Sequence, residues 1–348
     1  MLKRRTAVVT AGIALIALAA TGCNRSSSGS SGSSGAAGGG KVGIDQPRSD
    51  SDFWNSYAKY IESGITDMKI DALPRTNSQN DITKLAANVQ SLTAQGAKAL
   101  VMAPQDTAAV ASTLDDLASK KIPVVSVDTR PDKGKVFMVV RADNKAYGQK
   151  ACKFLGDKLG GKGTVVEFEG DLASINGRDR SEAFGECMKS NYPNIKVLAE
   201  ETLWKGDVAS AKLQDELNKG PVNGIYMQAG GVFLAPTLAL LSQKNLLVPP
   251  TDPKHVFIVS NDGIPQEFAA IKEGKIDATV SQPADLYAKY ALYYAKAALD
   301  GKSFQAGPTD HNSNIITIPN GLEDQLPAPL VTAENVNDSS LWGNQVGK

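Results

Sequence analysis

Short runs of almost exclusively apolar residues recur along most of this chain and alternate with segments of helical periodicity. The runs AKALVMAP (97–104) and IPVVSVD (122–128) have almost no polar residue in their interiors. A strand that is apolar on both faces must be covered on both faces, which is typical of a parallel sheet between two helical layers. One intervening segment, capped by Asp81, places five apolar residues on a single helical face: Ile82, Leu85, Ala86, Val89 and Leu92.

This alternation occurs twice, which predicts two lobes. A first series runs from Lys41 to about residue 140, and a second continues to about residue 282 with strands expected near 164–170, 222–228 and 255–262. About 308 residues follow residue 40, more than one hydrophobic core usually serves. We therefore expect two doubly wound α/β lobes. Such sheets bind ligands at the carboxyl ends of their strands, so the ligand would lie between the lobes.

The first residues have the pattern of an export signal. Three cations at positions 3–5 precede an apolar stretch from Ala7 to Ala20, which is shorter than the roughly 20 residues that a membrane-spanning helix needs. Ala20-Thr21-Gly22-Cys23 resembles the lipobox of bacterial lipoproteins. That resemblance implies a signal peptide over 1–22, a lipid on Cys23 and an extracytoplasmic, membrane-anchored protein, with a secreted unlipidated product as the alternative. Residues 23–40 then form the anchor and a flexible Gly/Ser tether.

Composition and motifs argue against several classes of function. Lys plus Arg and Asp plus Glu number 37 each, and the chain has no basic tract, which argues against nucleic acid as a partner. The two histidines, His255 and His311, lie far apart without the spacing of a metal site. Gly156–Gly163 nearly matches a phosphate-binding loop but lacks the Ser/Thr and follows a helix. No Gly-x-Ser-x-Gly elbow occurs in the body. We therefore expect no cofactor, no metal and no catalysis.

Six segments together resemble the ribose-binding branch of the type I periplasmic binding proteins. They stand in that family's order and near its spacing: DFWNSYAKYIE (52–62), NSQNDITKLAANVQSL (77–92), IPVVSVDT (122–129), NGRDRSEAF (176–184), IVSNDG (258–263) and ATVSQP (278–283). The resemblance covers about residues 41–340. It implies a sugar-binding protein that delivers its ligand to the permease of an ABC importer, with a separate ATPase subunit supplying the energy.

The same resemblance implies a Venus-flytrap architecture of two lobes joined by three crossovers. We place the crossovers near Ala142, Gln282 and Asn312. The first lobe then comprises 41–142 plus 283–311, and the second comprises 143–282 plus 312–340. Ligand binding would close the lobes by a hinge motion, without making or breaking a bond, and the protein would act as a monomer.

Carried over position by position, the resemblance nominates ligand-binding residues. They are Phe53, Trp54, Asp128, Arg178, Trp204, Asp262 and Gln282, with Arg130 as a substitute for the arginine that the family has directly after the aspartate. Ionised groups hydrogen-bond sugar hydroxyls strongly, and aromatic rings cover the apolar faces of a sugar or polyol. Arg48, Asp52 and Arg75 lie in loops that could also reach the cleft. Arg178 could instead pair with Asp179 or Glu182 on a helix surface.

Several positions depart from the family's pattern and leave the ligand open. Ala229-Gly230 replaces an Asn-Asp pair, Ser51 replaces Asn, and Thr129 follows Asp128.

The resembled fold can place the helices that carry Cys152 and Cys187 side by side, which implies a disulfide, with two separate buried thiols as the alternative.

Three other functions remain as alternatives. A sugar-responsive repressor would need a DNA-binding helix-turn-helix where this chain has its signal and tether. A sensor that presents a sugar or autoinducer-like molecule to a membrane receptor would use the same cleft. An enzyme of carbohydrate metabolism would need to turn over its bound sugar.

Overall fold

The computed structural model describes residues 39–346, which form two α/β lobes, each built around one sheet. Both lobes that the repeated alternation predicts are present, which confirms the predicted fold class. The predicted signal peptide (1–22), the predicted lipid-attachment residue Cys23 and most of the tether (23–40) lie outside the described residues.

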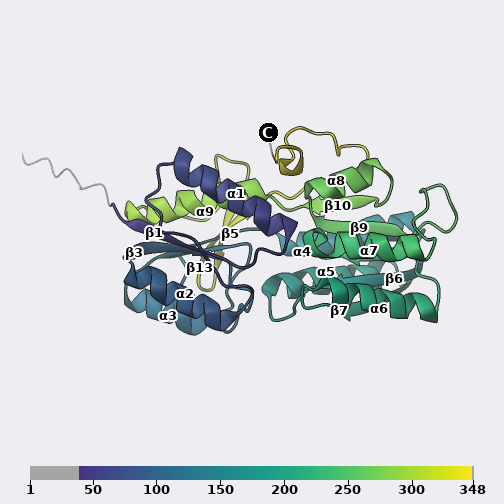
Figure 1. Cartoon of the computed structure of the whole chain (residues 1–348), viewed down its shortest axis with the longest axis horizontal. Coiled ribbons are helices and arrows are strands. Elements are labelled where there is room, and N and C mark those ends of the chain that lie inside the picture. The colour runs from purple at the N-terminus through teal and green to yellow at the C-terminus, as the bar shows by residue number, and fades with distance from the viewer. Residues whose placement is uncertain (1–38, 347–348) are drawn as a thin grey trace, which may run out of the picture. The chain divides into compact units, whose positions relative to one another are not determined.

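The first lobe contains an eight-stranded sheet in the order β11-β12-β13-β5-β4-β3-β1-β2. Its strands are β1 (Lys41–Gln46), β2 (Thr76–Asn77), β3 (Ala97–Met102), β4 (Val124–Val127), β5 (Met138–Ala142), β11 (Gly307–Pro308), β12 (Asn314–Ile318) and β13 (Gly321–Leu326). All are parallel from β13 to β2, and β11 and β12 extend the sheet antiparallel. Helices α1 (Asp52–Asp67) and α9 (Ala284–Leu299) cover one face, and α2 (Ile82–Ala94) and α3 (Ala111–Ser119) cover the other (Figure 1).

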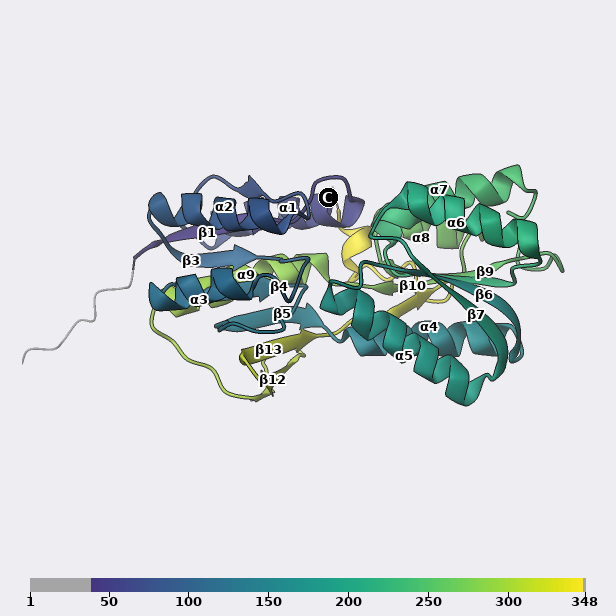
Figure 2. The ribbon, with the colours of Figure 1, turned by 90° about the horizontal axis from the view of Figure 1, so that it is seen from below.

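The second lobe contains a six-stranded sheet in the order β14-β10-β9-β8-β6-β7. Its strands are β6 (Lys162–Glu169), β7 (Asn194–Glu201), β8 (Gly224–Met227), β9 (Phe257–Asp262), β10 (Ala278–Ser281) and β14 (Leu330–Thr332), of which only β14 is antiparallel. Helices α4 (Asn144–Lys158) and α5 (Ile175–Asn191) cover one face. Helices α6 (Gly206–Lys219), α7 (Gly230–Gln243) and α8 (Pro265–Lys272) cover the other (Figure 2).

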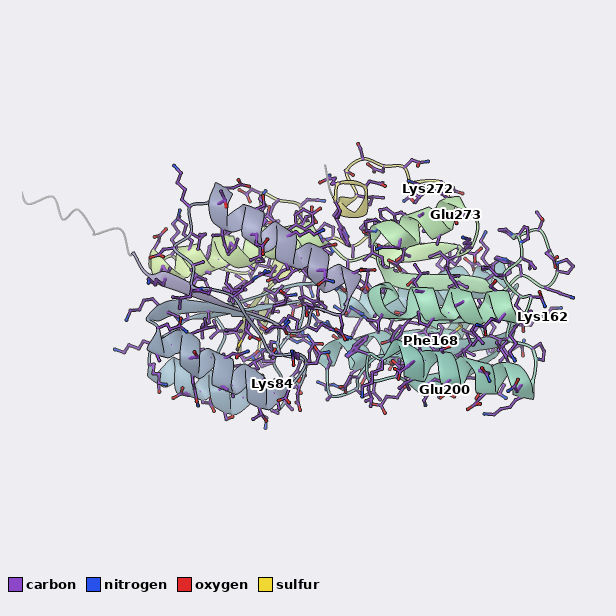
Figure 3. The ribbon with its side chains drawn as sticks, viewed as in Figure 1. Lys84, Lys162, Phe168, Glu200, Lys272 and Glu273 are labelled. Atoms are coloured by element: carbon purple, nitrogen blue, oxygen red, sulfur yellow. A yellow bond between two sulfur atoms is a disulfide. The ribbon has the colours of Figure 1, made fainter. Side chains whose placement is uncertain are left out.

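The elements form where the sequence pattern favours them. All four residues of β4 are buried, as expected for a strand that lies between two helical layers. Asp81 caps α2 as predicted, because its carboxylate accepts hydrogen bonds from the N–H groups of Thr83 and Lys84. Most apolar side chains point into the lobes and most charged ones point outward. Two residues labelled in Figure 3 are examples: Phe168 of β6 is buried within its lobe, and Lys84 of α2 is exposed.

The third crossover lies further along the chain than predicted. We expected it near Asn312, but β12 and β13 belong to the first lobe, where β13 pairs in parallel with β5. Residues 312–326 therefore lie in the first lobe instead of the second, and the chain crosses at 327–329 before β14 pairs with β10. Pro327 and Pro329 explain the boundary, because proline cannot donate a hydrogen bond to a continuing sheet.

The last described residues contact both lobes. Leu341 packs into a core of the second lobe, and its neighbour Trp342, in the 3₁₀ helix η1 (Trp342–Asn344), packs into a core of the first. The Trp342 ring lies edge-on to Phe53, with their centroids 6.0 Å apart. The segment after β14 thus forms a further connection between the lobes, which the sequence analysis did not predict.

A disulfide joins Cys152 of α4 to Cys187 of α5, whose Cα atoms are 6.1 Å apart. The two helices pack side by side on one face of the second sheet. The bridge is one of the two arrangements that the sequence left open. It holds α5, which carries residues of the candidate site described below, against the rest of its lobe.

Replacing both cysteines by serine should lower the free energy of unfolding of the second lobe by about 3–4 kcal/mol, because the bridge closes a loop of 35 residues in the unfolded chain. Denaturant unfolding of the double variant against the oxidised protein measures this difference. Reducing agent should lower the stability of the native protein and leave the variant unchanged. Equal stability of the two proteins would contradict the prediction.

Candidate ligand-binding site

A small cavity lies between the two lobes, with about 40 Å³ of space for the centres of water-sized molecules. Its lining residues come from the carboxyl ends of strands and from the loops and helix turns that follow them, where doubly wound sheets bind their ligands. The first lobe contributes Arg48, Ser51, Phe53, Trp54, Gln105 and Asp128, and the second contributes Asn176, Arg180, Trp204, Ala229, Val232, Asp262 and Gln282.

Arg180 is the most constrained side chain of the cavity. Its guanidinium donates three hydrogen bonds, from Nε to Asn144 Oδ1 (2.6 Å), from Nη1 to the Gln228 carbonyl (2.5 Å) and from Nη2 to Gln282 Oε1 (2.7 Å). It also lies over the rings of Tyr147 and Trp204, at 5.1 and 5.8 Å from their centroids. The Arg180 side chain is therefore held in one orientation, with its cationic plane against the cavity.

Asp128 presents an unpartnered acceptor. The residue directly follows β4 and has a φ of 64°, a conformation that is uncommon for residues other than glycine. Its Oδ2 accepts a hydrogen bond from Asn176 Nδ2 at 2.9 Å, whereas its buried Oδ1 has no partner. Burial raises the pKa of this carboxyl to about 6, although Arg180 and Arg141 oppose the shift. A ligand hydroxyl could supply the hydrogen bond that Oδ1 lacks.

Asp262 provides the second carboxylate, at the end of β9. Its Oδ2 accepts a hydrogen bond from the N–H of Gly231 at 2.7 Å. Burial raises the pKa of Asp262, and burial together with the charge of Asp262 raises the pKa of the neighbouring Glu267. Glu267 is satisfied within its lobe, because it accepts hydrogen bonds from the N–H groups of Gly263 and Ile264. The free acceptor capacity of this pair therefore lies on Asp262.

Charges in the lining balance. Its two arginines, Arg48 and Arg180, stand against its two carboxylates, Asp128 and Asp262. Arg48 is also engaged outside the cavity, where it pairs with Asp50 and donates from Nη1 to the Trp204 carbonyl of the other lobe at 3.2 Å. The cavity thus offers two arginines as donors and two acidic side chains as acceptors, which suits a ligand with several hydroxyls.

Aromatic rings form the apolar part of the lining. Phe53 and Trp54 open α1 with their rings edge to face, 5.3 Å between centroids. Trp204 faces them from the second lobe, has a φ of 54°, and carries a buried Nε1 without a hydrogen-bond partner. The Trp204 ring lies directly against Gly170, where any Cβ atom would overlap it.

Replacing Gly170 by alanine should therefore displace Trp204 and lower ligand affinity about tenfold or more, because the indole would lose its place in the lining. Titration calorimetry with the sugar that the screen below selects measures this loss. Gly185→Ala is the matched control, since a Cβ there meets nothing within 4 Å. Equal affinities in the two variants would show that the position of Trp204 does not matter for binding.

The structure brings most of the predicted site residues together. Phe53, Trp54, Asp128, Trp204, Asp262 and Gln282 all line the cavity, as does Arg48. Asp52 instead accepts a hydrogen bond from Gln266 of the other lobe at 3.0 Å, and Arg75 pairs with Glu62 on the surface of its own lobe.

Arg178 and Arg130, the two arginines that the resemblance nominated, do not line the cavity. Arg178 instead pairs with Asp132 of the other lobe at 2.7 Å and donates to Thr107 Oγ1 at 3.1 Å. Arg130 pairs with Glu323 at 3.4 Å, away from the lining. Arg178 is therefore a link between the lobes, and its place in the cavity is taken by Arg180.

Helical geometry explains the exchange between these two arginines. Residues two apart on a helix point to different sides, whereas residues four apart share a face. Arg180 shares its face with Asn176 and with the buried Phe184, so the apolar pattern of α5 directs it inward. That pattern could have identified Asn176 and Arg180 from the sequence, but Gln105 and Val232 had no such signal.

Comparison with known proteins places the chain in a family. The profile of a family described as the periplasmic binding protein domain matches residues 42–303. The chain belongs to this family. The predicted resemblance is confirmed, and because the family consists of binding proteins, its members' role supports binding in place of catalysis.

Individual relatives agree with this assignment. The chain is 30% identical to the ribose import binding protein of Haemophilus influenzae over 66% of its own length and 76% of the relative's. It is 28% identical to a xylitol-binding protein of Mycolicibacterium smegmatis, over 67% of this chain and 65% of that protein. Among solved structures, an ABC transporter solute-binding protein of Mycobacterium smegmatis with bound glycerol superposes with a TM-score of 0.73 at 25% identity, covering 86% of this chain and 96% of that one.

Two further features are absent from residues 39–346, namely a cluster of candidate metal ligands and a membrane-spanning helix. This part of the chain has no group of three or more His, Cys, Asp or Glu side chains that could hold a metal ion. None of its helices has the length and apolar character needed to cross a membrane.

Proposed function

We propose that this protein is the extracytoplasmic solute-binding protein of an ABC importer and captures a neutral monosaccharide or polyol in the cavity between its lobes. The permease would then accept the ligand from the closed protein, and a separate ATPase would drive transport. The protein would act as a monomer and be held at the membrane by a lipid on Cys23. The importer role rests on the family, whose relatives include ribose import and xylitol-binding proteins.

The observation that carries the ligand class is the combination of free polar groups with balanced charge. Asp128 Oδ1 is a buried acceptor without a partner, and Trp204 Nε1 is a buried donor without one. A buried polar group that stays unsatisfied costs about 1–3 kcal/mol, so a ligand that satisfies both gains that energy. A sugar or polyol can do so, because each hydroxyl both donates and accepts, and its C–H faces can cover Phe53 and Trp54.

The departures from the family's pattern argue against taking ribose as the ligand without a test. Ala229 lines the cavity where the family has an asparagine, so this chain lacks an amide that would bond a hydroxyl there. The smaller side chain at position 229 favours a ligand that is bulkier or differently substituted. Val232, also in the lining, makes that part of the wall apolar.

A thermal-shift screen tests the proposed ligand class. The protein without residues 1–23 would be screened against pentoses, hexoses, polyols, disaccharides and nucleosides. A ligand at 100 times its dissociation constant should add about 2.7 kcal/mol of stability. We expect a stabilising ligand among the sugars or polyols. If no compound of any class stabilised the protein, and the protein were shown to be folded and free of co-purified ligand, the proposal would be contradicted. Capture of the permease by the liganded protein then separates import from receptor signalling.

A further inference from the structure

A buried ionic network lies beside the cavity and joins the two lobes. Its centre is Arg141, the penultimate residue of β5, whose side chain is 2% exposed. The guanidinium donates from Nη1 and Nη2 to Asp179 Oδ2, both at 3.1 Å, and from Nη2 to Asn176 Oδ1 at 2.7 Å. Asn176 and Asp179 both belong to α5 of the second lobe. A fully buried cation of the first lobe is therefore bonded to the second lobe.

Charges within this network balance. Glu323 of β13 lies 3.9 Å from Arg141 and 3.4 Å from Arg130, and Arg130 lies 4.0 Å from Asp179. Two arginines thus face two carboxylates, and the carboxylate of Asp179 is the only one of these four groups that the second lobe supplies. Buried charges are tolerated when they are paired and costly when they are not. Separating the lobes would take Asp179 away from both arginines, so the network favours the arrangement in which α5 contacts the first lobe.

Arg141 also acts on the ligand site through one intervening residue. Asn176 lines the cavity, and its amide has an accepting end and a donating end. Because Arg141 occupies the accepting oxygen, the Nδ2 group faces Asp128 and donates to its Oδ2 at 2.9 Å. That bond leaves Asp128 Oδ1 as the oxygen without a partner in the cavity.

We propose that Arg141 is a positioning residue for ligand binding that couples the contact between the lobes to the orientation of Asp128. Among its side-chain hydrogen bonds, only the one to Asn176 reaches a residue of the cavity lining. Arg141 would make the acceptor of Asp128 available when Asp179 of the second lobe is docked against the first. The effect on affinity rests on the proposed function, whereas the effect on the contact between the lobes does not.

Two readouts and four variants test this proposal. Spin labels at the exposed Ser112 of α3 and Gln214 of α6 report the distance between the lobes without any ligand. D-ribose and xylitol serve as the binding probes. The variants are Arg141→Met, Asp179→Asn, Arg141→Lys and, as control, Arg178→Gln, which removes a different inter-lobe ion pair, the one with Asp132.

Arg141→Met and Asp179→Asn should each shift the ligand-free distance distribution to longer values and weaken binding of the better probe at least tenfold. Arg141→Lys should keep the distribution near that of the native protein, because its charge still pairs with Asp179. It should still weaken binding at least fivefold, since one ammonium cannot replace the two-pronged contact to Asn176 and Asp179. Arg178→Gln should weaken binding less than threefold.

Unchanged distances in both Arg141→Met and Asp179→Asn would overturn the coupling. Full affinity in Arg141→Lys would overturn the positioning role. Asp179→Asn keeps the test decisive if Arg141→Met fails to fold, because it removes only the charge of the partner. If neither D-ribose nor xylitol binds the native protein, that result counts against those two ligands alone, and the distance measurement still decides whether the network holds the lobes together.

Discussion

Replacing Arg180 by methionine should weaken sugar binding by about a hundredfold or more. Removing one partner of a buried, hydrogen-bonded charge typically costs about 2–5 kcal/mol, and each 1.4 kcal/mol is a factor of ten in affinity. Arg180 is such a group, because it is 3% exposed and holds Asn144, Gln228 and Gln282 in place as it faces the cavity. Calorimetric titration with the screened sugar measures the loss.

Arg178→Met provides the matched control for this prediction. It makes the same substitution two residues earlier on the same helix, at an arginine that forms a partly exposed ion pair with Asp132 outside the lining. Pairs of that kind contribute about 0.2–1 kcal/mol, so the control should lose less than about fivefold. A larger loss in Arg178→Met than in Arg180→Met would reverse our assignment of the two arginines.

Replacing Asp128 by asparagine should abolish binding and stabilise the ligand-free protein at the same time. Asparagine can still accept from Asn176 Nδ2, but it presents a donor where the ligand needs an acceptor. The stability effect follows from the pKa. Burial raises the pKa of Asp128 from its ordinary 3.8 to about 6, so the folded protein binds this proton more tightly than the unfolded chain.

The sign of the pH dependence follows from that difference. Below about pH 4, Asp128 is mostly protonated in both the folded and the unfolded protein, so its carboxyl group does not lower the free energy of unfolding. Above about pH 6 it is charged in both, and the free energy of unfolding is lowered by the full amount. A shift of about two pKa units corresponds to about 3 kcal/mol, as an order of magnitude. Asp128→Asn should therefore be more stable than the native protein by up to that amount at pH 8 and equal to it near pH 4.

Thermal unfolding of both proteins without ligand, between pH 4 and pH 8, measures this difference. A stability gain that does not depend on pH would show that the carboxylate is not the source of the cost. A variant that binds sugar as tightly as the native protein would remove Asp128 from the site.

Much of the fold could be predicted from the sequence because the central strands are apolar throughout. Runs such as 122–128 have no other stable place than the middle of a covered sheet, and they fix the two β–α series. The strands β12 and β13 escaped prediction because their polar residues follow no regular pattern, and Glu323 and Asp324 are buried only through ion pairs and hydrogen bonds from distant residues. Side chains that depend on long-range partners leave no local pattern.

The sequence likewise predicted some residues of the site and missed others. Asp128 and Asp262 could be predicted, since a carboxylate that ends an apolar strand has no role in a core, and both line the cavity. The motif around residue 178 contains two arginines, and the family resemblance alone did not identify the inward one. Arg141 was not predicted at all, because its partners Asn176 and Asp179 lie 35 and 38 residues away and in the other lobe.

A crystal structure of the protein with the sugar or polyol that gives the largest thermal shift tests the central claim most directly. We predict one ligand molecule in the cavity between the lobes, with a hydroxyl donating to Asp128 Oδ1, another accepting from Arg180 or Trp204 Nε1, and an apolar face against Phe53 or Trp54. A ligand bound outside this cavity, or bound inside it without contact to Asp128 and Arg180, would contradict the account.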